Sequence, residues 1–251
     1  MYDPIKRTET LEKYAFKGES RAYYRFRPAK WYGGIVTGDV TCCNLLCAFC
    51  WAGDKIRHHP GQVGKFYTPE EVFKKLCSIG DKKGYRLMRL SGQEPTIGRE
   101  HLLKLLSLVD KTKYRFILET NGILIGHEKE YAEALSKFKN LHVRVSLKGT
   151  NEEEFSALTD ANPEGFSLQL KGLENLVAAG VSCHPSVMVS FSDPGNIRKL
   201  GERLAAVAPF LKKEMEIEEL ILYPHVTKRL KDTDFKYRVG HDPGCVPKEL
   251  I

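Results

Sequence analysis

Short runs of apolar and β-branched residues alternate with helical patterns along most of the chain. The runs that predict strands are residues 34–40, 85–91, 115–119, 141–147, 183–191 and 217–223. The patterns that predict helices, with apolar residues every three or four positions, are residues 69–79, 99–110, 127–138, 163–179 and 194–208. This alternation predicts an α/β fold with a parallel sheet and crossover helices.

The number of strand–helix units limits the shape of that sheet. Six units are fewer than the eight of a closed barrel, so we expect an open or partial barrel. The 251 residues suit a single domain of this kind. We expect its core over residues 33–230, with side chains that carry chemistry in the loops after the carboxyl ends of the strands.

The two ends of the chain have a different character from the core. Residues 1–32 are polar and basic, and we expect them to form an N-terminal extension packed over the core. The polar stretch from residue 225 is expected to be irregular, and residues 231–251 to form a C-terminal tail.

Composition and charge narrow the range of partners. A hydrophobic content of 42% is enough for a packed core. The net charge of +7 suits an anionic partner such as a nucleotide, a nucleic acid or an acidic protein surface, although a merely basic surface explains it equally well. No run approaches the ~18 apolar residues of a membrane span, and the N-terminus lacks a signal-peptide pattern. We therefore expect a cytoplasmic protein without a membrane partner, and a monomer.

Seven cysteines are the strongest chemical signal. Their odd number makes a disulfide framework a poor explanation. Cys43, Cys47 and Cys50 follow the first predicted strand with the spacing C-x3-C-x2-C. With His58 or His59 they could complete a zinc site. Alternatively, three thiolates could hold three corners of a [4Fe–4S] cluster and leave the fourth iron open to a ligand.

The remaining cysteines give weaker signals. Cys42 is interpreted as a packed thiol beside the cluster, with a role as an alternative ligand left open. Cys77 and Cys183 lie in apolar patterns and are expected in the core. Cys245 lies in the polar tail, so no auxiliary cluster is expected.

The cysteine motif, with the aromatic Phe49 before its last cysteine, resembles the signature of the radical S-adenosylmethionine (radical SAM) enzymes. The resemblance implies a partial (β/α)6 barrel, in agreement with the strand count. It also implies that Cys43, Cys47 and Cys50 hold a [4Fe–4S] cluster whose unique iron binds S-adenosylmethionine. Reductive cleavage then yields methionine and a 5′-deoxyadenosyl radical that abstracts hydrogen from a substrate. The electrons are expected from a low-potential donor such as flavodoxin or ferredoxin.

Segments after later strands extend the resemblance. Gly92, Gln93 and Glu94 stand where the family has a Gly-Gly-Glu-Pro-like motif that meets the methionine ammonium, with Gln93 in place of the second glycine. Asn121 belongs to a Glu-Thr-Asn-Gly segment similar to that of radical activases. These correspondences imply cofactor contacts for Gly92, Gln93, Glu94 and Asn121.

The fourth and sixth strands end in two more segments of this kind. Ser146 and Lys148 resemble the Asp-Leu-Lys segment of glycyl-radical activases, with Ser146 in place of the acid that meets the ribose. His225 resembles the histidine of a Leu-Pro-Tyr-His segment that binds the nucleoside end. These segments imply further cofactor contacts for Ser146, Lys148 and His225.

The resemblance does not fix the substrate. The activase-like segments favour a protein or peptide. The basic charge, and a Cys50–Trp51 pair that resembles the wybutosine-synthesis enzymes, favour the alternative of tRNA or other RNA modification. A zinc-stabilised binding protein is the alternative from a different class.

Overall fold

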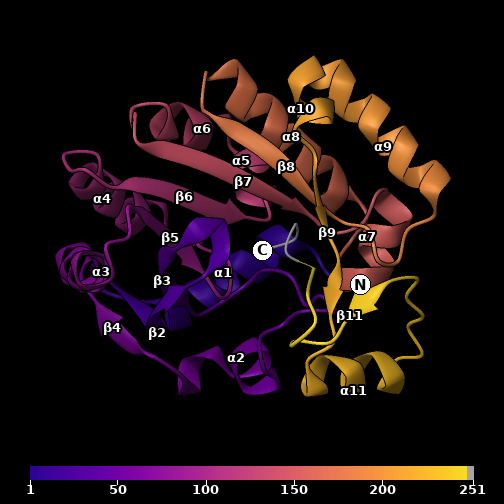
Figure 1. Cartoon of the computed structure of the whole chain (residues 1–251), viewed down its shortest axis with the longest axis horizontal. Helices are drawn as coiled ribbons and strands as arrows, with labels where there is room; N and C mark the ends of the chain where they lie inside the picture. The colour runs from indigo at the N-terminus through magenta and orange to yellow at the C-terminus, as the bar shows by residue number, and fades with distance from the viewer. Residues whose placement is uncertain (248–251) are drawn as a thin grey trace.

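A computed structural model describes residues 1–247. Six parallel strands form the centre of one sheet, and their order in space is their order in the chain (Figure 1). They are β3 (Ile35–Val40), β5 (Leu87–Ser91), β6 (Arg115–Thr120), β7 (Leu141–Leu147), β8 (Cys183–Met188) and β9 (Glu216–Glu218). The sheet does not close on itself, since β9 pairs only with β8 among the described strands. The partial barrel predicted from six strand–helix units is confirmed.

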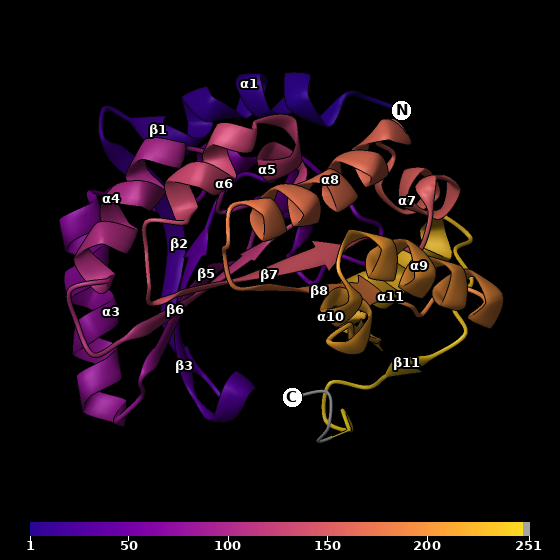
Figure 2. The ribbon, with the colours of Figure 1, turned by 90° about the horizontal axis from the view of Figure 1, so that it is seen from above.

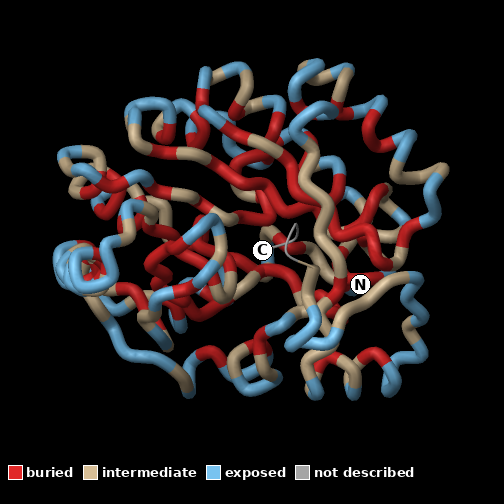
Figure 3. Tube along the Cα trace, in the orientation of Figure 1, coloured by how far each residue is buried: buried red, intermediate tan, exposed pale blue. Residues whose placement is uncertain are grey.

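Crossover helices cover the outer face of this sheet (Figure 2). They are α3 (Pro69–Lys83), α4 (Arg99–Val109), α5 (Ile123–His127), α6 (Lys129–Leu135), α7 (Glu152–Thr159), α8 (Glu164–Ala178), α9 (Pro194–Val207) and α10 (Pro209–Lys213). Local sequence explains their starts: Thr68 and Glu71 form a capping box at α3, and Asp193 accepts two backbone N–H groups at α9. Buried residues concentrate between the sheet and these helices (Figure 3).

The N-terminal extension contributes to the sheet as well as packing over the core. After α1 (Pro4–Ala15), the strands β1 (Phe16–Lys17) and β2 (Ser20–Ala29) extend the sheet, with β2 antiparallel to both β3 and the short β4 (Lys65–Tyr67). Basic residues and an irregular burial pattern conceal this strand in the sequence, because a β-bulge between Tyr23 and Arg25 interrupts the alternation of its two faces. Tyr23 is buried beside His101, whereas Arg25 points away from the core.

The C-terminal region also departs from expectation. Residues Pro224–Asp232 form α11, with Pro224 in the first turn where a proline is tolerated. The expectation of an irregular stretch from residue 225 is therefore wrong for this part. The polar composition of this segment concealed the helix, because only Val226 and Leu230, one helical turn apart, are buried in it among mostly polar residues. The strands β10 (Leu220–Ile221) and β11 (Gly240–His241) form a small parallel pair beside α11.

The remaining short elements lie next to the cysteine motif and before β3. They are α2 (Asp54–His58) and the 3-10 turns Trp31–Gly33 and Pro60–Gln62. Within residues 1–247, no helix is both long and apolar enough to cross a membrane.

Candidate functional site

A cavity of about 870 Å³ opens at the carboxyl ends of the parallel strands. Every residue expected to bind a cluster or cofactor lines it, and these residues are Cys43, Cys47, Phe49, Cys50, Gly92, Gln93, Glu94, Asn121, Ser146, Lys148 and His225. The loops that carry them are far apart in the sequence and meet because parallel strands end at one edge of the sheet. Their roles toward a cofactor are taken up as a proposal below.

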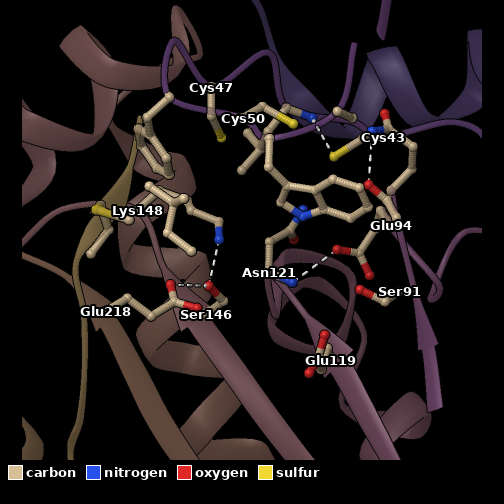
Figure 4. Close-up of a pocket in the computed structure, with 18 of the residues that line it drawn as sticks. Cys43, Cys47, Cys50, Ser91, Glu94, Glu119, Asn121, Ser146, Lys148 and Glu218 are labelled. Carbon is tan, nitrogen blue, oxygen red and sulfur yellow. Dashed lines mark hydrogen bonds between the residues drawn. The ribbon is translucent and has the colours of Figure 1, made fainter. Parts of the chain in front are cut away.

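The cysteine loop, residues 43–53, forms one wall of the cavity (Figure 4). Figure 4 shows Cys43, Cys47 and Cys50 along this loop, with their sulfur atoms on its cavity side. Burial raises the pKa of the Cys43 thiol well above its usual value, and raises that of Cys47 to about 11. Cationic iron would offset that desolvation cost by binding the thiolates directly.

Three cysteines on one loop are the donor set that the resemblance calls for. The iron atoms of a cubane each take a separate cysteine, so the thiols of Cys43, Cys47 and Cys50 fit three corners of a [4Fe–4S] cluster. In the described part of the chain, no three His, Cys, Asp or Glu side chains gather closely enough to hold a single metal ion.

Cys42 faces away from the cavity. Its backbone has a φ of 69°, which turns its side chain into a small apolar cluster with Leu11, Ala15 and Ile97. The interpretation of Cys42 as a packed thiol agrees with this placement. Cys183 in β8 is buried in the core as expected, whereas Cys77 in α3 is only partly buried against it, and neither lines the cavity.

Arginines from three regions hold the backbone of the cysteine loop, and no sequence pattern indicates this role. Arg7 Nε donates to Cys43 O at 3.4 Å, Arg57 Nη2 to Cys47 O at 3.0 Å and Arg229 Nη1 to Cys50 O at 2.8 Å. Each cysteine carbonyl thus has its own arginine. Asp54 pairs with both Arg57 and Arg229, which joins α11 to the loop.

Glu94 joins the loops after β5 and β6. Its carboxylate accepts from Thr96 N, Thr96 Oγ1, Thr120 Oγ1 and Asn121 N, at 2.6–3.0 Å. Gly92, at a φ of 93°, leaves no room for a side chain: a Cβ would lie 2.8 Å from the Tyr24 hydroxyl. Gln93 folds back, and its Nε2 donates to Gly92 O. Four donors on one carboxylate give Glu94 a structural role in addition to any contact with a cofactor.

Asn121 continues the connection to the cysteine loop. Its Nδ2 donates to Asn44 Oδ1 at 2.7 Å, and its Oδ1 accepts from Ile123 N at 3.0 Å. Asn44 is fully buried next to Cys43. The order of the cysteine loop therefore depends on the end of β6.

Lys148 and Ser146 meet an acid from a neighbouring strand. Lys148 Nζ donates to Ser146 Oγ, which in turn donates to Glu218 Oε2 at 3.0 Å. Glu218 also pairs with Arg144 at 2.7 Å. An acid is absent at position 146, but the carboxylate of Glu218 lies within hydrogen-bond distance of the Ser146 side chain. Sequence reasoning missed it because Glu218 stands in a run whose apolar residues predict only a strand.

His225 and Phe49 also line the cavity. His225 Nε2 donates to Trp51 O at 2.7 Å, so this histidine fixes the end of the cysteine loop. Phe49 packs against Phe191 at a ring distance of 5.6 Å, and Lys148 Nζ lies 6.0 Å from its centre.

Comparison with known proteins shows to which family this chain is related. The model of the radical SAM superfamily matches residues 40–196. A curated protein named probable GTP 3′,8-cyclase, from Thermococcus kodakarensis, is 30% identical over 175 residues, which are 68% of this chain and 52% of the relative. A protein of the same name from Methanosarcina mazei is 28% identical, over 80% of this chain and 60% of its own length. The chain spans about half the length of the first of these relatives, and both are named as cyclases rather than activases.

Solved structures show the same fold at low identity. SuiB of Streptococcus suis, bound to its precursor peptide SuiA, aligns with a TM-score of 0.60 at 16% identity, over 94% of this chain and 52% of SuiB. TYW1 with a lysine–pyruvate adduct aligns with a TM-score of 0.57 at 16% identity, over 93% of this chain and 89% of TYW1. At these identities the likeness concerns the fold alone.

Proposed function

Since the chain belongs to the radical SAM superfamily, we propose that Cys43, Cys47 and Cys50 hold its [4Fe–4S] cluster and that the cavity binds S-adenosylmethionine beside it. Enzymes of this family use these two cofactors, and the zinc-stabilised binding protein is excluded by this membership. The cluster, when bound and reduced, supplies cleavage of the sulfonium to methionine and a 5′-deoxyadenosyl radical. The observation that carries the site assignment is the convergence of the three cysteines and four strand ends on one cavity.

The chain's own residues would orient the cofactor within that cavity. Lys148, half-buried and 6.0 Å from the Phe49 ring centre, offers a point charge to the methionine carboxylate. Glu218 and Ser146 offer acceptors to the ribose hydroxyls at the end of β7. The proposed cofactor contacts also include other residues that line the cavity, and these are Phe49, Gly92, Gln93, Glu94, Asn121 and His225.

We propose that the substrate enters through the open side of the sheet. This opening lies between β9 at one edge and the paired strands β2 and β4 near the other edge. A small phosphate-bearing substrate is supported by the cyclase relatives, which are named for GTP. A protein or peptide substrate, favoured by the activase-like segments, is the second candidate and is supported by the peptide bound in the SuiB structure. The third candidate, RNA modification, predicts that the protein binds tRNA and that the affinity for tRNA falls as the salt concentration rises.

Anaerobic assay of the holoenzyme tests the cofactor assignment. With dithionite and S-adenosylmethionine, we expect a brown protein that releases 5′-deoxyadenosine and methionine. Cys43→Ala, Cys47→Ala and Cys50→Ala should each abolish release, whereas Cys77→Ala should not. Turnover that persists in any of the three loop variants would refute the ligand assignment.

A further inference from the structure

The open side of the cavity carries a pair of arginines on β2 that the proposed cofactor contacts do not use. Arg25 and Arg27 line the cavity together with Cys50 and Trp51. We call Tyr24, Arg25 and Arg27, all on β2, the lateral edge. Two residues apart on one strand, the arginines are on the same face of the sheet.

One buried carboxylate holds both arginines. Arg25 Nε donates to Asp39 Oδ2 at 2.6 Å, and Arg27 donates through Nε to Oδ2 at 2.8 Å and through Nη2 to Oδ1 at 3.3 Å. The Asp39 side chain has no exposed surface, whereas those of Arg25 and Arg27 are 44% and 24% exposed. Asp39 therefore lies behind the arginines and fixes their orientation from below.

This pairing leaves charge and donors on the cavity side. Two guanidinium groups against one carboxylate leave an excess of one positive charge. Both terminal nitrogens of Arg25, and Nη1 of Arg27, have no hydrogen-bond partner within residues 1–247. The neighbouring hydroxyl of Tyr24 is buried and also has no partner in that part of the chain.

Trp51 further restricts the arginines. The Arg25 and Arg27 guanidinium carbons lie 5.7 and 5.9 Å from the Trp51 ring centre. Contact with an aromatic ring and a fixed carboxylate lowers the entropy lost when the guanidinium groups bind a ligand. Cys50 and Trp51 are adjacent, so an anion bound here would lie beside the cysteine loop.

We propose that Arg25 and Arg27 form a subsite for a phosphate group of the substrate. A planar guanidinium binds a phosphate through two parallel hydrogen bonds, and three unpaired nitrogens supply more donors than a single carboxylate needs. The subsite rests on the proposed function, because it places the rest of a phosphorylated substrate next to the cofactor cavity.

Binding to the anaerobic holoenzyme tests this subsite without relying on turnover. The probes are GTP, guanosine, inorganic pyrophosphate and succinate at equal ionic strength, measured by calorimetry. GTP should bind at least about tenfold more tightly than guanosine, and pyrophosphate more tightly than succinate. Raising the salt concentration should weaken GTP binding.

Variants then assign the phosphate contact to the lateral edge. Arg25→Gln and Arg27→Gln should each weaken GTP binding about tenfold, leave guanosine unchanged and change S-adenosylmethionine affinity less than twofold. Arg198→Gln removes the same charge from exposed α9 and should match the unaltered protein. Arg25→Lys keeps the positive charge but lacks the paired nitrogens of the guanidinium, so it should bind GTP more tightly than Arg25→Gln and less tightly than the unaltered protein.

Other outcomes overturn the subsite. The subsite would be refuted if the protein bound neither GTP nor pyrophosphate, or if it bound succinate more tightly than pyrophosphate. Unchanged GTP affinity in both glutamine variants would refute it as well. Loss of S-adenosylmethionine affinity in place of GTP affinity would assign the pair to the cofactor carboxylate instead. Because the cysteine variants report S-adenosylmethionine cleavage separately, failure of the subsite is distinguishable from failure of the proposed function.

Discussion

Arginines support the cysteine loop from behind and also line the lateral edge of the cavity, but the two sets are paired differently. Arg57 and Arg229 direct their terminal nitrogens at the chain's own carbonyls, including those of Cys47 and Cys50. Arg25 and Arg27 bind Asp39 mainly through Nε and keep terminal nitrogens unpaired in the described structure. Paired donors order the backbone, whereas unpaired donors at a cavity are available to a ligand. The proposed phosphate subsite rests on this difference in pairing.

Removing Arg229 of α11, which holds the cysteine loop, should have the largest effect on folding. In Arg229→Ala, the carbonyls of Ala48, Cys50 and Ala52 lose their donor and Asp54 loses a partner. We expect a loss of about 3 kcal/mol in the free energy of unfolding, because the carbonyls of the buried residues Ala48 and Ala52 are left without a donor. Denaturant unfolding and the iron content after anaerobic purification measure it.

A matched variant separates charge from these contacts. Lys228→Ala removes an exposed positive charge from the same helix and should leave stability and iron content nearly unchanged. Equal losses of stability in the two variants would contradict a specific role for Arg229. The effect would then come from the lost positive charge and not from the hydrogen bonds that distinguish the cysteine loop from the lateral edge.

A change at Glu94 tests whether this carboxylate belongs to the scaffold or only to the ligand. In Glu94→Gln, an amide N–H₂ replaces one oxygen and faces donors from Thr96, Thr120 or Asn121. We expect a loss of about 2 kcal/mol in the unfolding free energy, even without cofactor. Glu100→Gln, on the exposed first turn of α4, is the control. Lower S-adenosylmethionine affinity with unchanged stability would show that Glu94 serves the ligand alone.

Hydrophobic periodicity predicted the six parallel strands and five of the crossover helices because those elements bury regular apolar faces. It missed β2 and α11, whose buried residues are few and stand among charges. For the site, the cysteine spacing and strand-end residues were readable from local motifs. Glu218, Arg25 and Arg229 were not, because each matters through a partner distant in the sequence: Ser146, Asp39 and Cys50 respectively.

The smallest effect concerns the face of β2 opposite the lateral edge. Tyr23 donates its hydroxyl to His101 Nε2 at 2.9 Å, while His101 Nδ1 donates to Glu19 O at 3.1 Å. Burial lowers the pKa of His101 from 6.5 to about 4, because the charged ring is poorly solvated and cannot accept from Tyr23. Between these two values the unfolded chain binds a proton that the folded chain does not, so stability falls as the pH falls.

From pH 7 to pH 5.5 the His101 share of that loss should be about 1 kcal/mol in the unfolding free energy. His101→Gln keeps a donor and an acceptor but does not titrate, so its stability should vary less with pH over this range. Chemical unfolding at the two pH values, for both proteins, measures the difference. Because neither Tyr23 nor His101 lines the cavity, the phosphate affinity of correctly folded protein should be unaffected by the His101 substitution. A variant that changed phosphate binding and pH-dependent stability together would mean that the two faces of β2 are coupled, and that the lateral edge is not independent of the core behind it.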